Sequence, residues 1–109
     1  MPGPRIPETI RIPVAARITL FNHQILPDPN VFYQPRYQGR FLYLDRCDYG
    51  QVGRVCRLTY TGALDGWDFA IFKYSDERYD PDEWFFPGAA QVDGTLEGAM
   101  RAGLAAYPP

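Results

Sequence analysis

Hydrophobic residues recur with two different periods along the chain, and the period changes at the turn residues 27–30 (PDPN). Before this point, the stretch 13–26 carries apolar side chains at the spacing of one helical face, namely Val14, Ile18, Phe21 and Ile25. Pro13 fits the first turn of such a helix and Pro27 would end it. The pattern favours a helix, and the β-branched residues of the stretch leave a strand as the alternative.

From residue 31 onward, apolar and polar residues alternate as they do in strands. Residues 31–37 and 40–46 predict a hairpin that turns at Gln38-Gly39. Pro35 cannot donate a hydrogen bond to a neighbouring strand, so the first strand is expected at an edge of the sheet. Residues 47–53 are expected to form a loop.

A second hairpin is predicted from residues 52–62 and 67–75, joined by a four-residue loop that places Tyr60 opposite Phe69. Any even loop length keeps the same residues together on each face. One face is apolar and is expected to join the core: Cys56, Leu58, Tyr60, Trp67, Phe69 and Ile71. The opposite face mixes polar and aromatic side chains: Arg57, Thr59, Thr61, Asp68, Ala70, Phe72 and Tyr74.

The last third of the chain predicts one more helix. An acidic loop over 75–83 and a short aromatic strand or docking segment over 83–88 precede it. Thr95 can cap a helix over 96–106, whose small residues would let it lie close to a sheet. We therefore expect one α+β domain over residues 1–109, with residues 1–6 as a disordered lead. Its architecture would be a four-stranded antiparallel meander with the N- and C-terminal helices packed on one face.

Composition and charge narrow the classes of function. The chain has 109 residues and a formal net charge of −2, which argues against nucleic-acid binding. Its charges are uneven: residues 1–64 hold eight arginines and four acids, whereas residues 65–109 hold nine acids and three basic residues. The two parts can neutralise each other within the fold or between subunits. No apolar run approaches the roughly 20 residues of a membrane helix, and no signal-peptide pattern is present, so we expect a soluble cytoplasmic protein without membrane contact.

Candidate metal and thiol chemistry is weak. Cys47 and Cys56 with the distant His23 do not supply four zinc ligands. A cross-strand disulfide is geometrically possible, but free thiols are favoured, with Cys56 buried and unreactive. The acidic loop is expected to be solvated, because it lacks the ligand spacing of a calcium loop: Asp76, Glu77, Asp80, Asp82 and Glu83. We predict no metal and no cofactor.

Candidate catalytic groups are equally sparse. Asp45 and Asp68 could act as a carboxylate pair only if the fold brought them together, and each is expected instead to pair with an arginine on a neighbouring strand. His23 has no nucleophile placed beside it and is expected at a surface or helix end. The aromatic run 84–86 could form a binding platform, although such runs usually belong to the core. We predict no catalytic residues.

The chain resembles a family of small bacterial proteins that have no assigned activity. The matching segments include FLYLD (41–45), CRLTYTG (56–62), WDFAIFKYS (67–75) and GTLEGAM (94–100). The resemblance covers about the last two thirds of the chain and is consistent with an α+β meander. It implies no substrate, cofactor or catalytic residue.

These patterns predict a non-enzymatic interaction or accessory protein that forms a homodimer or binds another protein. The expected interface is the mixed face of the second hairpin, with Arg57, Thr59, Thr61, Phe72 and Tyr74. The alternative is a small-molecule binder or minor enzyme with an aromatic pocket between helix and sheet, lined by Tyr43, Tyr60, Trp67 and Phe69.

Overall fold

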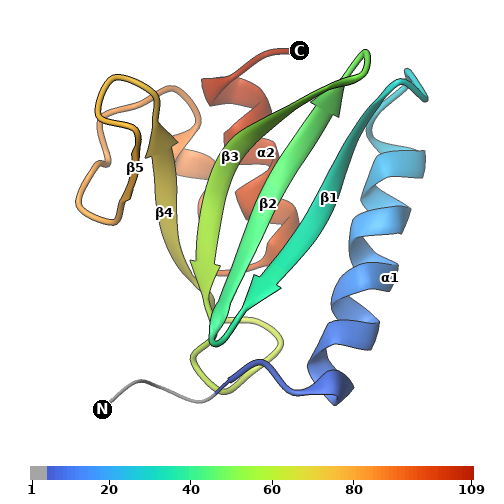
Figure 1. Cartoon of the computed structure of the whole chain (residues 1–109), viewed down its shortest axis with the longest axis vertical. Coiled ribbons are helices and arrows are strands. Elements are labelled where there is room, and N and C mark those ends of the chain that lie inside the picture. The colour runs from blue at the N-terminus through green and yellow to red at the C-terminus, as the bar shows by residue number, and fades with distance from the viewer. Residues whose placement is uncertain (1–4) are drawn as a thin grey trace.

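The computed structural model describes residues 5–109 and contains one antiparallel sheet of five strands in the order β1-β2-β3-β4-β5 (Figure 1). The strands are β1 (Val31–Gln38), β2 (Phe41–Asp48), β3 (Gln51–Thr59), β4 (Asp68–Lys73) and β5 (Arg78–Asp80). The predicted α+β meander is confirmed, but the expected number of four strands is wrong. The fifth strand lies inside the segment that we expected to be an acidic loop, and its three residues are too few to show alternation.

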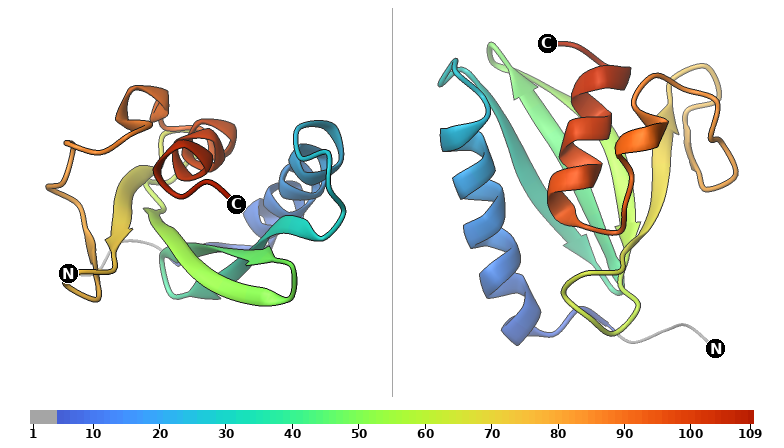
Figure 2. Two further views of the ribbon diagram at one scale, coloured as in Figure 1. Left: turned by 90° about the horizontal axis from the view of Figure 1, so that it is seen from above. Right: turned by 180° about the vertical axis from the view of Figure 1, so that it is seen from behind.

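Two α-helices pack on the same face of the sheet, which leaves the opposite face uncovered (Figure 2). They are α1 (Glu8–Gln24) and α2 (Leu96–Ala106), and the short 3₁₀ helix η1 (Ala89–Gln91) precedes α2. The strand alternative for residues 13–26 is therefore wrong. No helix within residues 5–109 is both long and apolar enough to cross a bilayer.

Helix α1 begins five residues earlier than its apolar pattern predicted. The backbone N–H groups of Ile10 and Arg11 both bond to the carbonyl of Pro7, so the first turn forms there. Pro13 then lies inside the helix rather than in its first turn, which removes one backbone hydrogen bond. The pattern missed this first segment because it is mostly exposed and polar. The N-terminal segment 1–6, which was expected to be disordered, does not extend to Ile6, because Ile6 is buried and its backbone N–H donates to the carbonyl of Gly39. Residues 1–4 lie outside the described part of the chain.

The buried stripe of α1 consists of Val14, Ile18 and Phe21, as its spacing predicts. Ile25 does not belong to it. Because the helix ends at Gln24, Ile25 is 39% exposed and Leu26 turns into the core instead.

The tight turns of the sheet sit close to their predicted places. Gly39-Arg40 joins β1 to β2, and Gly39 adopts the left-handed conformation with φ of 60°. The expected loop 47–53 is shorter than predicted, because only Tyr49-Gly50 separate β2 from β3. Both residues have positive φ, as a two-residue hairpin turn requires.

In the β3–β4 hairpin, Leu58 rather than Tyr60 lies opposite Phe69. The register thus differs by two residues from the predicted one, since Trp67 leaves the strand and its N–H bonds to Gly94. The faces are unchanged by an even shift. All six residues predicted for the core face are buried: Cys56, Leu58, Tyr60, Trp67, Phe69 and Ile71.

Helix α2 has its predicted bounds and its predicted cap. The Thr95 hydroxyl accepts a hydrogen bond of 2.9 Å from the N–H of Gly98. Gly103 faces the sheet, where an added Cβ would come within 2.5 Å of the Tyr33 hydroxyl and of a Val55 methyl group. The absence of a side chain therefore lets this helix lie directly on β1 and β3.

Candidate functional site

The uncovered face of the sheet carries an ordered array of arginine and aromatic side chains, which we call the outer face. Strand alternation places every second residue on it, and the register aligns Arg36, Tyr43, Arg57 and Ala70 across four strands. The array consists of Arg36, Phe41, Tyr43, Asp45, Arg54, Arg57, Phe72 and Tyr79.

Each central arginine of the outer face stacks on an aromatic ring. The guanidinium carbon of Arg57 lies 4.7 Å from the ring centroid of Phe41 and 5.7 Å from that of Tyr79. Arg36 lies 4.4 Å from the centroid of Tyr43 in the same way. These distances are typical of cation–π contacts, which hold the planar groups in fixed orientations.

The rings also contact one another across the strands. Tyr79 on β5 lies between Tyr43 and Phe72, with centroid distances of 5.2 and 4.9 Å. Arg54 covers Phe72 at 5.5 Å. Burial under these neighbours raises the pKa of Tyr79, so its hydroxyl stays protonated. The array is thus a continuous packed layer from β1 to β5.

Asp45 is the buried carboxylate of the outer face. It is 7% exposed, and the Nε of Arg36 donates to it at 3.1 Å. This hydrogen bond raises the pKa of Arg36. The prediction that Asp45 pairs with an arginine of a neighbouring strand is confirmed. The same prediction for Asp68 is wrong, because Asp68 forms no ion pair within residues 5–109.

Arg54 and Arg57 have no such partner. No ion pair joins either to a carboxylate anywhere in residues 5–109. The Nε of Arg57 is buried, and its N–H donates to no acceptor among residues 5–109. A buried donor without an acceptor costs about 1–3 kcal/mol, so the position of Arg57 is held at a cost in stability.

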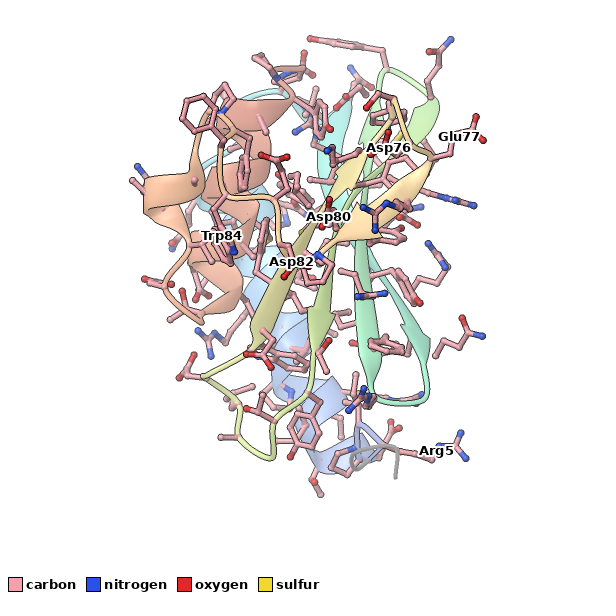
Figure 3. All side chains as sticks on the ribbon, turned by 90° about the vertical axis from the view of Figure 1, so that its left-hand side faces the viewer. Arg5, Asp76, Glu77, Asp80, Asp82 and Trp84 are labelled. Carbon is pink, nitrogen blue, oxygen red and sulfur yellow. The ribbon has the colours of Figure 1, made fainter. Side chains whose placement is uncertain are left out.

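A cluster of five acidic residues lies at the β5 edge of the sheet: Asp76, Glu77, Asp80, Asp82 and Glu83. Figure 3 shows Glu77 projecting on the side of the outer face, while Trp84 lies on the side of the helices. Lys73 is held by Glu83 at 3.2 Å, Asp76 at 3.4 Å and Asp80 at 3.8 Å. The acidic segment is therefore partly neutralised from within, and no group of three potential metal ligands occurs in the described residues.

The predicted interface residues are placed as follows. Arg57, Thr59 and Phe72 lie on the outer face. Tyr74 lies past the end of β4, where its hydroxyl donates to the carbonyl of Arg54 and its ring packs on Phe72. Thr61 lies in the loop after β3 and donates to the carbonyl of Gly66, away from the array.

The predicted pocket residues are not brought together. Tyr60, Trp67 and Phe69 are buried on the helix side, where Tyr60 packs on Trp67 at 5.5 Å. Tyr43 lies on the outer face, because its neighbours Leu42 and Leu44 fill the core. The four residues thus line no common cavity.

The remaining candidate groups are dispersed. Asp45 lies on β2 and Asp68 on β4, with β3 between them, and the two are offset by four residues along β2, so they form no carboxylate pair. His23 is exposed in the last turn of α1. Cys47 and Cys56 are both free, and burial raises the pKa of the Cys56 thiol well above its usual range.

The aromatic run 84–86 is divided between core and solvent rather than forming a strand. Phe86 stacks on Phe69 with centroids 5.9 Å apart, which docks the segment on the core. Trp84 is 50% exposed and Phe85 is 99% exposed. The sequence could not separate these roles, because the segment has no regular period.

Sequence reasoning also missed Arg36, Arg54 and Tyr79 as members of the array. Arg36 and Tyr43 occupy alternating positions in two adjacent predicted strands, so pairing the first hairpin would have placed them together. Tyr79 offered no such signal, since it lies in the short strand β5.

Comparisons of the chain with protein-family models, with curated proteins and with solved structures find no match. The resemblance to small bacterial proteins therefore stays a prediction.

Proposed function

We propose that the protein is a non-enzymatic interaction module that forms a homodimer through its outer face. The observation that carries the proposal is the pair Arg54 and Arg57, which stack on aromatic rings without a carboxylate partner in residues 5–109. Arginine and tyrosine are the residue types that dominate the energetics of protein interfaces. Arg57 is partly buried and Arg54 is exposed. Guanidinium groups held against aromatic rings bind carboxylates strongly, since little side-chain entropy is lost.

The charge distribution across the sheet favours a second copy as the partner. Residues 31–59, which form β1 to β3, contain five arginines and two aspartates, whereas residues 68–83 around β4 and β5 contain six acids and two basic residues. A two-fold axis parallel to the strands would place the basic side of one copy over the acidic side of the other. An isologous interface of this kind is self-complementary.

Carboxylates suit this surface better than phosphates do. Asp45 and Asp68 lie on the outer face itself, and the chain as a whole is acidic. Nucleic acid would be repelled by both. We place the dimer in the cytoplasm, where the two free cysteines would stay reduced.

Sedimentation velocity over a concentration series tests the proposal. We expect a dimer for the natural chain. For Arg57→Glu we expect a dissociation constant at least tenfold higher, because the change places a carboxylate against acidic residues of the partner. Arg101→Glu is the matched control, since Arg101 is exposed on α2 at the opposite side of the molecule. A monomer at high micromolar concentration, or equal dimer content in all three proteins, would overturn the proposal.

A further inference from the structure

The segment Trp84–Pro87, which we call the aromatic loop, presents large apolar side chains to solvent. Phe85 is 99% exposed and Trp84 is 50% exposed, although folded domains usually cover most of such a surface. The loop lies beyond β5 and reaches the helix side, so it is separate from the outer face (Figure 3). Its exposure therefore has to be explained independently of the dimer.

The aromatic loop is held firmly on the domain. Phe86 stacks on Phe69, and Trp84 lies 6.1 Å from the same ring. The N–H of Phe85 donates to the Glu83 carboxylate at 2.8 Å, which fixes the backbone at that residue. Phe85 is thus presented by an anchored backbone, as an interface anchor requires.

Beside Phe85 lies a hollow of about 350 Å³ between the aromatic loop, the end of β4 and the C-terminal end of α2. Its walls are largely apolar and include Ile71, Phe86, Pro87 and Tyr107. The charged groups that line it are Lys73 and Glu83. The hollow suits a long side chain with an apolar stem and a polar head.

The charges around the hollow favour a cationic head over an anionic one. Lys73 is shared by Glu83, Asp76 and Asp80, so it offers little attraction to an anion. The hydrogen bond from the Phe85 N–H, together with the one from Lys73, lowers the pKa of Glu83 and keeps that carboxylate charged. Acids outnumber bases over residues 73–83, which disfavours phosphate and anionic lipid.

We propose that the hollow binds an arginine or lysine side chain from a basic segment of another protein. The methylene stem would pack against Phe85 and Phe86, and the cationic head would lie over an aromatic ring within reach of Glu83. The hollow shares Tyr74 with the predicted interface, and its other lining residues do not belong to that interface.

Fluorescence anisotropy on the full chain tests the inference with a defined probe. The probe is a labelled nine-residue peptide in which arginine and leucine alternate, and the control peptide carries glutamine in place of arginine. We expect the arginine peptide to bind at least tenfold more tightly. Phe85→Ala should weaken its binding about tenfold, whereas Ile12→Ala, which removes an exposed apolar side chain on α1, should leave it unchanged.

Phe85→Ala is expected to fold normally because the side chain is almost fully exposed, and circular dichroism verifies this. Equal affinity for both peptides would overturn the inference, and so would an affinity that Phe85→Ala does not change. Absence of binding at about 1 mM peptide would also overturn it, since that limit corresponds to only about 4 kcal/mol of binding free energy. None of these outcomes depends on the oligomeric state.

Discussion

The hydroxyl of Tyr33 on β1 donates a hydrogen bond of 2.7 Å to the backbone carbonyl of Met100 in α2. The bond joins the edge of the sheet to the last helix, 67 residues further along the chain. Burial raises the pKa of Tyr33 well above its usual range, so the hydroxyl remains a donor. One turn later on the same helix, Gly103 faces the same tyrosine, and this close approach sets the distance between helix and sheet.

Gly103→Ala is therefore expected to lower the free energy of unfolding by about 1–2 kcal/mol. An added Cβ would press on Tyr33 and Val55, and this strain outweighs the gain of about 1 kcal/mol in helix propensity. Urea unfolding followed by circular dichroism measures the difference. A variant as stable as the natural chain would show that the helix can shift outward at no cost.

Trp67→Ala should be far more damaging, with a loss of about 3–5 kcal/mol. The Trp67 ring is 3% exposed, packs on Tyr60 and donates from Nε1 to the carbonyl of Leu64 at 2.6 Å. Thermal and urea unfolding check this value. Trp84→Ala is the matched control, because its half-exposed ring should cost about 1 kcal/mol or less; equal losses in the two variants would contradict the assignment of Trp67 to the core.

The faces of the β3–β4 hairpin could be predicted from the sequence, but its register could not. Alternation fixes which residues share a face, and any even shift preserves that result. The actual register depends on Trp67, whose N–H bonds to Gly94 in a distant part of the chain. A local sequence pattern cannot predict a contact between residues so far apart in the chain.

The outer face was predictable only in part for a similar reason. Arg57 and Phe72 followed from the parity of one hairpin, whereas Tyr79 belongs to a strand of three residues. The pattern of the first hairpin alone does not show on which face of the sheet Tyr43 lies. Tyr43 lies on the outer face because its neighbours in the same strand, Leu42 and Leu44, are buried in the core.

Asp45→Asn should destabilise the chain by about 1–3 kcal/mol, since the buried position would lose its charge and its strong hydrogen bond from Arg36. Asp68→Asn provides a control on the same face, because Asp68 is exposed and should change stability by no more than about 0.5 kcal/mol. Urea midpoints of the two variants give the comparison. If they are equal, the Arg36–Asp45 pair contributes nothing beyond a surface contact.

The ion pair between the helices should make stability depend on pH. Arg17 on α1 donates to Glu97 in the first turn of α2, with an Nε–Oε2 distance of 2.9 Å. This hydrogen bond lowers the pKa of Glu97 below its ordinary value of 4.5. A carboxylate whose pKa is depressed by folding contributes stability above the unfolded pKa, and the contribution is lost as pH falls through the folded pKa.

Glu97→Gln should therefore destabilise the chain at neutral pH, by about 1 kcal/mol or less because both side chains are partly exposed. The difference between variant and natural chain should shrink as pH falls below 4.5 and vanish once Glu97 is protonated in the folded state. Urea unfolding of both proteins at several pH values measures it. Glu8→Gln is the control, since Glu8 is exposed, forms no ion pair within the described residues and should change stability at neutral pH by no more than about 0.5 kcal/mol. A difference that stays constant at all pH values would mean that Glu97 acts through packing rather than through its charge.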